Sequence, residues 1–459
     1  MLKFMAFPTK ESEDKPLTRV LKKPIFAAVL LFTTLSCWSF SAPLNNGFDP
    51  TFHLASIWCG WGESPGKCEN YGARDYGYGG NIPDQLRGLT TSEMSDQQIV
   101  DPHTRSLFYP IMRVFAGDNA TQSVLLMRLI QSFIASMIFG SLIHFSSRKM
   151  KTAVLSAWTF TMIPIIISTL PQTTPRSWAY LSGMSSWAYL MLALDRHKQK
   201  QNSKILWIFY GFSLFLAFAS RWDATLFVAF TTAVVLSIHF IKNNLMKFRT
   251  LVWFLVSGMV SMGLLRLIFP RLATYTTFDF GSTFTSGKTI FQLIHIPENI
   301  ADGLGLGVRL ADLGPNLIGI IGVVLFVFML SRSLDSANKF QIFSVVSIAI
   351  FMFMAMFQIT LSWTEQIGPS GVYVVQLLTV ILGLSVALAN DAQMYLYRKS
   401  NQAIFISLLG VSHALALFAR MEWAVRPSSE LNDTYFNLSL NGGWWWNSPI
   451  GPNVVFLIG

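Results

Sequence analysis

The sequence predicts an all-α polytopic membrane protein with about 11–12 transmembrane helices and a large first extracytoplasmic loop. Of the 459 residues, 52% are hydrophobic and only 13% are charged, against roughly 25% in a soluble domain. Apolar segments long enough to span a bilayer recur along the whole chain. Lys and Arg are concentrated in alternate connections between these segments, as the positive-inside rule requires. The net charge of +10 therefore needs no nucleic-acid partner to explain it.

Eleven apolar segments are candidate transmembrane spans. The first has a basic flank that would also suit a signal peptide. It is about 18 residues long and no clear small-residue cleavage site follows it, so we interpret it as a retained anchor. Residues 454–459 would be the start of a twelfth span that ends with the chain. The eleven segments lie near 25–42, 122–145, 152–170, 178–194, 205–220, 224–241, 250–269, 315–331, 341–361, 371–390 and 402–419.

The charge distribution predicts that the N-terminus is cytoplasmic and that the protein is a multipass protein of the plasma membrane. With this orientation the cytoplasmic segments hold 20 basic and 6 acidic residues, whereas the outer segments hold 13 basic and 18 acidic residues. Residues 1–24 would form a cytoplasmic tail and residues 25–459 a single transmembrane domain. Its main extracytoplasmic loops would be residues 43–121, 270–314 and 420–451.

The stretch that follows the first span offers the strongest catalytic candidates. Asp49 can cap a helix that begins at Pro50, because proline fits the first helical turn and aspartate accepts hydrogen bonds from its amides. His53 would then lie one turn further on, on the same face as Asp49. Phe52 and Trp58 give this helix an apolar surface suited to a membrane interface. The stretch would therefore present a carboxylate and an imidazole at the water–lipid boundary.

Two arginines are candidates for binding an anion near the outer surface. Arg128 lies within the second span, where a charge usually faces a cavity or a partner; alternatively it snorkels to the outer surface. Arg176 follows Pro175, which could begin the fourth helix and leave free amides that favour anions. A prolyl turn with one arginine is also common without any ligand. If both arginines act, charge-assisted hydrogen bonds to a phosphate are the expected role.

Two further outer segments have a local interpretation. Residues 102–115 predict a second interfacial helix that leads into the second span. The short turn between the fifth and sixth spans contains Arg221 and Asp223, which we expect to form a local ion pair, with Trp222 as an interfacial anchor. We assign no catalytic role to Asp223.

Cys59 and Cys68 both lie in the predicted first outer loop, nine positions apart around a glycine- and proline-containing turn. A disulfide between them is expected in an oxidising compartment, with two free thiols as the alternative. The pair alone offers too few ligands for zinc, and we predict no metal site. The sequence contains no Walker loop, no HExxH and no Gly-x-Ser-x-Gly. We therefore expect no required cofactor, and the sequence leaves open whether a divalent cation takes part.

Several of these features together resemble a known family. The chain is similar to an uncharacterised bacterial multipass family, common in actinobacteria, that is grouped with the GT-C superfamily of integral membrane glycosyltransferases. The resemblance covers nearly the whole chain through short motifs. It rests on Asp49 with His53, the Cys59 to Cys68 stretch, Pro175-Arg176, Gly371-Val372-Tyr373 and Trp444-Trp445-Trp446.

Two positions depart from the pattern of that family. The family has an Asp-Glu pair at the start of the first outer loop, with a histidine four residues after the Asp; here Pro50 replaces the Glu. Near the third-last span the family has Gly-Arg-Tyr, whereas this chain has Val372 in place of the Arg. These departures concern the catalytic base and a phosphate contact.

The resemblance implies transfer of a sugar from a polyprenyl-phosphate donor to a cell-envelope glycan acceptor on the outer face of the bilayer. It implies Asp49 as the general base, with His53 as its orienting partner or as a contact to the acceptor. Arg128 and Arg176 would be the phosphate contacts. One alternative is a transporter or flippase for a lipid-linked intermediate, which would need more charges within the spans than Arg128. Another is a non-catalytic envelope-assembly subunit, for which Pro50 and Val372 would be typical.

Overall fold

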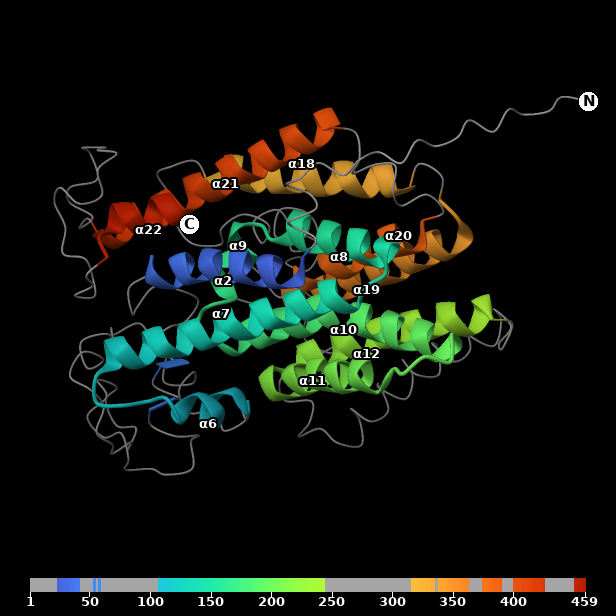
Figure 1. Cartoon of the computed structure of the whole chain (residues 1–459), viewed down its shortest axis with the longest axis horizontal. Coiled ribbons are helices and arrows are strands. Elements are labelled where there is room, and N and C mark those ends of the chain that lie inside the picture. The colour runs from blue at the N-terminus through green and yellow to red at the C-terminus, as the bar shows by residue number, and fades with distance from the viewer. Residues whose placement is uncertain are drawn as a thin grey trace, which may run out of the picture.

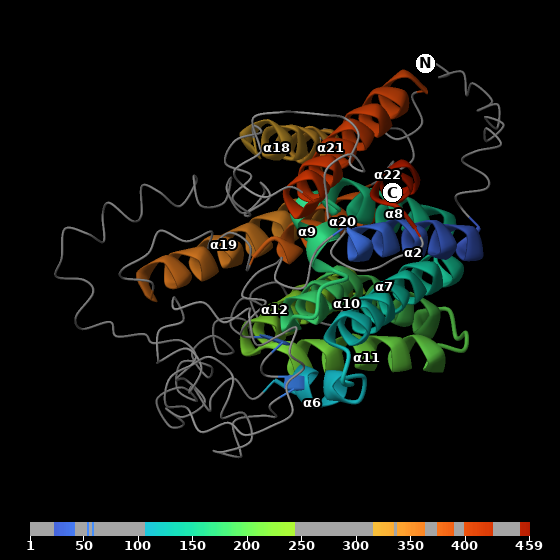
Figure 2. The same cartoon turned by 90° about the vertical axis from the view of Figure 1, so that its left-hand side faces the viewer.

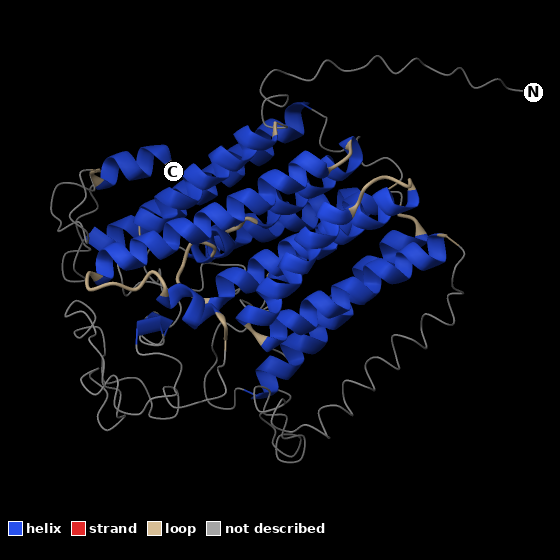
Figure 3. Ribbon diagram, turned by 60° about the horizontal axis from the view of Figure 1, so that its bottom comes forward, coloured by secondary structure: helices blue, strands red, loops and turns tan. Residues whose placement is uncertain are grey.

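The computed structural model describes residues 23–41, 53–54, 57–58, 106–243, 315–334, 337–362, 374–389, 399–425 and 450–459. For residues 148, 222, 315–323, 356–362, 399–406 and 422–425 it describes the backbone alone. These parts of the chain consist of helices and their connections and contain no strand (Figure 3). The predicted all-α fold class is therefore confirmed.

The helices follow the predicted spans closely (Figure 1). The predicted interfacial helix before the second span is present as α6. The predicted span at 250–269 lies outside the described residues. The helices are α2 (Pro24–Phe40), α6 (Phe108–Arg113), α7 (Ala120–Phe145), α8 (Arg148–Thr161), α9 (Pro164–Thr169), α10 (Pro175–Lys198), α11 (Lys204–Ser220), α12 (Trp222–Lys242), α18 (Pro315–Leu334), α19 (Lys339–Ser362), α20 (Gln376–Leu388), α21 (Lys399–Val425) and α22 (Pro452–Ile458).

The third predicted span is not one continuous helix. The sequence predicts a single apolar segment over 152–170, but α8 ends at Thr161 and α9 begins at Pro164. Proline has no N–H to donate, and its ring clashes with the carbonyl four residues earlier. Pro164 therefore starts a new short helix and does not continue α8.

The surface of the described helices is that of a membrane protein. Helix α7 and residues 223–242 of α12 are each long and apolar enough to cross a membrane. Six shorter apolar helices or described parts of helices accompany them. Large side chains such as Phe133, Ile208 and Phe218 are more than half exposed. Extensive exposed apolar surface of this kind is typical of contact with lipid and unusual in a soluble monomer.

Helix α10 lies at the centre of the bundle and packs against α7, α11, α12 and α20 (Figures 1 and 2). Nearly all its residues from Pro175 to Ala193 are buried. Close packing with α20 depends on small residues, as is common between membrane helices. A Cβ on Gly183 would lie 3.0 Å from Gln376 of α20, and a Cβ on Gly383 would overlap the ring of Trp187.

The bundle has two chemically different ends. We call one the basic end: Arg196 at the end of α10 donates to the carbonyl of Phe145 at the end of α7 (3.2 Å), and Lys242 at the end of α12 lies near Leu388 of α20. The ends of α10 and α12, which hold Lys and Arg residues predicted to be cytoplasmic, thus share this end. We call the other the site end; it holds the end of α2, the starts of α7 and α10, and the α11–α12 turn. That the site end faces outward stays a prediction.

Candidate functional site

His53 is held at the site end by helix α6. Its side chain is 9% exposed, and its Nδ1 lies 2.8 Å from the hydroxyl oxygen of Tyr109. The two rings are stacked, with centroids 5.9 Å apart and planes inclined by 25°. Residues 53 and 54 are helical, as the sequence predicts. His53 is therefore anchored on α6 through a buried polar contact.

Two guanidinium groups lie close enough to His53 to influence its protonation. Burial, followed by the positive charges of Arg176 and then Arg221, holds the pKa of His53 well below its ordinary value. Each of these arginines comes from a different part of the chain. The structure thus brings His53 and Arg176, two of the predicted site residues, into one neighbourhood and adds Arg221 to them.

Arg176 is fixed by the start of α10. Thr174 is the N-cap residue, and its Oγ1 accepts a hydrogen bond from the backbone N–H of Arg176 at 3.0 Å. Pro175 is the first helical residue, as predicted, because its fixed φ suits that position. The guanidinium side chain is 7% exposed. Its charge therefore acts in a region that bulk water screens only weakly.

Arg221 lies in the α11–α12 turn and forms the predicted local ion pair. Its Nε donates to Oδ1 of Asp223 at 2.9 Å, and the same oxygen accepts from the backbone N–H of Ala224 at 3.0 Å. Ser106 Oγ donates to the carbonyl of Ala219 at 2.8 Å. This bond ties the segment before α6 to the end of α11, so Arg221 and Tyr109 are held in the same region.

Buried polar and aromatic side chains of α7 and α10 pack against α6. Trp178 of α10 packs edge-on against Phe108, with centroids 5.0 Å apart. Its Nε1 donates to Oε1 of Gln131 on α7 at 2.8 Å, and Gln131 Nε2 donates to Sδ of Met112 at 3.3 Å. These contacts join α6, α7 and α10. They hold α6, and with it Tyr109, in a defined position over the ends of the two long helices.

Arg128 faces the inside of the bundle. It is 2% exposed, and its Nη1 donates to the carbonyl of Ser39 at the end of α2 at 3.2 Å. Its electrostatic neighbour is Arg420 of α21. The described contacts of Arg128 and Arg176 are thus with different residues, although Gln131, one turn after Arg128, is bonded to Trp178.

The other predicted site residues, Asp49, Cys59 and Cys68, lie outside the described residues. Tyr109 and Arg420 were not predicted as site residues, and Arg221 was predicted only as part of a local ion pair. Arg420 directly follows the last predicted apolar segment, and only its burial at 6% exposure distinguishes it from an ordinary flanking arginine. Within the described ranges no group of three His, Cys, Asp or Glu side chains could hold a metal ion.

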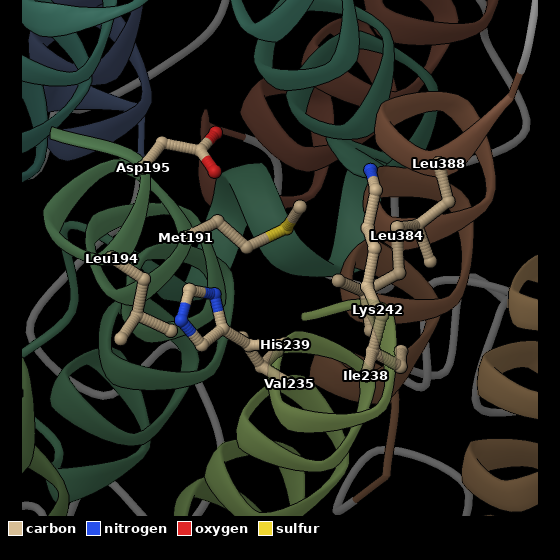
Figure 4. Close-up of a pocket in the computed structure, with 9 residues that line it drawn as sticks. All are labelled: Met191, Leu194, Asp195, Val235, Ile238, His239, Lys242, Leu384 and Leu388. Carbon is tan, nitrogen blue, oxygen red and sulfur yellow. The ribbon is translucent and has the colours of Figure 1, made fainter. Parts of the chain in front are cut away.

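A separate cavity of about 50 Å³ lies at the basic end (Figure 4). Its walls are mainly apolar, with three ionisable side chains around it. Figure 4 shows Met191 between Asp195 and Lys242. Since this cavity lies at the opposite end from His53, it belongs to a different part of the molecule. It is lined by Met191, Leu194, Asp195, Val235, Ile238, His239, Lys242, Leu384 and Leu388.

The helical fold, the apolar surface and the buried polar residues at one end define an all-α integral membrane protein. A family model described as "Predicted membrane protein (DUF2142)" matches residues 31–300. Because this match covers more than half of the chain, the chain belongs to that family. The predicted membrane location and membrane family are thereby confirmed. The comparison with curated proteins gave no match. The comparison with solved structures likewise gave none.

Proposed function

We propose that the protein is a membrane glycosyltransferase of the GT-C type. It moves a sugar from a polyprenyl-phosphate donor to a cell-envelope acceptor at the site end of the bundle. The observation that carries the proposal is the buried position of His53 against Tyr109, where the positive charges of Arg176 and Arg221 both act on the imidazole. Two guanidinium groups beside a neutral imidazole suit a reaction whose leaving group is a phosphate.

The proposed reaction is a direct displacement at the anomeric carbon of the donor sugar. The acceptor hydroxyl gives its proton to the Asp49 carboxylate while its oxygen bonds to that carbon. The bond between the carbon and the phosphate oxygen breaks, and polyprenyl phosphate leaves with the electron pair. Arg176 and Arg221 offset the charge that develops on it, with Arg128 as a further phosphate contact nearer to α2.

His53 has a positioning role in this scheme. Its low pKa keeps the imidazole neutral, so it can both accept and donate a hydrogen bond. One ring nitrogen is engaged by Tyr109. In the proposed scheme the imidazole so held orients the acceptor hydroxyl or the Asp49 carboxylate, which the sequence places four residues earlier.

Turnover by purified protein in lipid nanodiscs tests the proposal. The substrate is a radiolabelled polyprenyl-phosphate sugar, and the readouts are donor binding and release of polyprenyl phosphate. Asp49→Asn is expected to bind the donor normally but to release product about a hundredfold to ten-thousandfold more slowly. Arg176→Gln is expected to weaken donor binding. Arg113→Gln is the control, because Arg113 is exposed at the end of α6.

Two results would overturn the proposal. If the native protein and Asp49→Asn both bind the donor and neither releases product, a non-catalytic assembly subunit becomes the better description. If the native protein does not bind the donor at all, the transporter alternative is favoured.

A further inference from the structure

Among the described residues, a group of buried N–H donors without acceptors lies between α2 and α21. Arg420 of α21 is 6% exposed and Trp38 of α2 is 1% exposed. The guanidinium carbon of Arg420 lies 5.8 Å from the ring centroid of Trp38. Arg420 Nε, Arg420 Nη2 and Trp38 Nε1 are all buried, and within the described parts of the chain they have no hydrogen-bond partner. A buried donor that is left without a partner costs about 1–3 kcal/mol, and a charged one costs more.

A second guanidinium group borders the same turn of α2. Arg128 donates to the carbonyl of Ser39, the residue next to Trp38, and its positive charge interacts unfavourably with that of Arg420. The last turn of α2 is therefore flanked by Arg128 through Ser39 and by Arg420 through Trp38. Like charges in a buried place repel each other, so an anion at Arg420 would also weaken its repulsion with Arg128.

The chemistry of these groups selects a phosphate. Guanidinium N–H groups pair with phosphate oxygens in a bidentate manner, and the indole N–H of Trp38 offers one further donor. A phosphate provides several acceptor oxygens and a negative charge at once. It would therefore satisfy the buried donors and offset the repulsion between the two arginines.

The surroundings favour a lipid as the source of the phosphate. On α21 itself, Val411 and Leu415 are 53% and 45% exposed. Helix α22, which packs on α2 and α21 with Phe456 edge-on against Phe418, carries Leu457 at 81% exposure. These side chains form the surface that acyl chains would cover. A lipid could place its chains there and its headgroup phosphate at Arg420.

We propose that Arg420, Trp38 and Arg128 form a binding site for the phosphate of an anionic membrane lipid. The site lies at the end of α2, between α7 and α21. It does not depend on the transferase proposal, because Arg420 and Trp38 carry it and neither is part of the group around His53. The lipid can be a bulk phospholipid or a polyprenyl phosphate, since both offer the same phosphate chemistry.

Lipid binding to the delipidated full-length protein in detergent tests the site. Lipid adducts are measured by native mass spectrometry and thermal stability is followed by melting. The probes are phosphatidylglycerol, polyprenyl phosphate, diacylglycerol and inorganic phosphate. We expect one tightly held lipid for either phosphate-bearing lipid and none for diacylglycerol. Arg420→Gln is expected to weaken this binding by about tenfold to a hundredfold, the range for hydrogen bonds to charged groups.

Two further variants keep the test independent of folding defects. Trp38→Phe keeps the ring but removes the N–H, so it is expected to weaken lipid binding even if Arg420→Gln does not fold. Arg113→Gln should bind lipid as the native protein does. Tighter binding of polyprenyl phosphate than of phosphatidylglycerol would support the site and indicate that it binds the lipid phosphate of the donor. Equal binding of the two lipids would support a general site for anionic lipids.

Three results would overturn the inference. They are unchanged lipid binding in Trp38→Phe and in folded Arg420→Gln, equal binding of diacylglycerol, and binding of inorganic phosphate as tight as that of the lipids. Donor turnover by the same variants separates the two proposals, since loss of lipid binding with normal turnover leaves the transferase proposal intact.

Discussion

The Nδ1 atom of His53 lies 2.8 Å from the hydroxyl oxygen of Tyr109, a residue 56 positions further along the chain. Both side chains are buried. The contact joins the predicted catalytic stretch after α2 to α6, which is itself held by Gln131 and Trp178. The position of His53 is thus fixed by three other elements of the bundle and not by its local sequence alone.

Replacing Tyr109 with Phe should impair turnover more than folding. The change removes the hydrogen bond to His53 and leaves its Nδ1 without that partner, which is expected to lower the free energy of unfolding by about 1–3 kcal/mol. Turnover should fall about tenfold because the imidazole is no longer fixed. The control is Tyr210→Phe, which removes a similar bond to Thr232 (2.7 Å) between α11 and α12. Equal losses of turnover in both variants would contradict a positioning role for Tyr109.

The pH dependence of stability should report the low pKa of His53. The folded-state pKa lies well below the ordinary value near 6.5, so the folded protein binds fewer protons than the unfolded chain. Stability is then complete above about pH 6.5 and falls as the pH decreases below it, by at most about 1.4 kcal/mol per pH unit.

Melting temperatures between pH 7.5 and pH 5 measure this effect. His53→Gln should lose less stability on acidification than the native protein does. The control His144→Gln changes an exposed histidine at the end of α7 and should keep the native pH dependence. If His53→Gln follows the native curve, His53 is not held neutral by its surroundings.

Substitutions of Arg221 and Asp223 should affect donor binding differently, although the two residues form one ion pair. The pair is 35% and 25% exposed, so breaking it is expected to cost only about 0–1 kcal/mol of stability. Arg221→Gln should also weaken donor binding about tenfold, because it removes one positive charge beside His53. Asp223→Asn should leave donor binding unchanged. Titration of labelled donor into nanodiscs that hold each variant compares the two. Equal weakening of donor binding would show that Arg221 only stabilises the α11–α12 turn.

Gly383 should be intolerant of even one methyl group. A Cβ at this position would overlap the ring of Trp187 on the central helix α10, and overpacking of this kind costs about 1–3 kcal/mol. Gly383→Ala is therefore expected to lower the melting temperature. Gly410→Ala is the matched control, since a Cβ there meets nothing within 4 Å and alanine favours a helix over glycine by about 1 kcal/mol. A higher melting temperature for Gly383→Ala would show that α10 and α20 can move apart.

The sequence alone determined the class of protein, because membrane insertion depends on local properties. Long apolar segments and the placement of Lys and Arg are legible without knowing any contact. The start of α10 at Pro175 and the Arg221–Asp223 pair were predicted for the same reason, since each involves neighbouring residues. The break at Pro164 also has a local cause, but the run of apolar residues around it predicted a continuous span.

Only the tertiary structure decided which polar groups meet. The group around His53 comes from four separate segments, which contain His53, Tyr109, Arg176 and Arg221. Arg420 contacts Trp38, although most of the sequence separates the two residues. Such contacts depend on how the helices pack. In a membrane bundle, packing is governed by small residues and side-chain shape, not by hydropathy. A pattern of hydropathy can therefore place each arginine near one end of its helix, but it cannot say which partner that arginine will face.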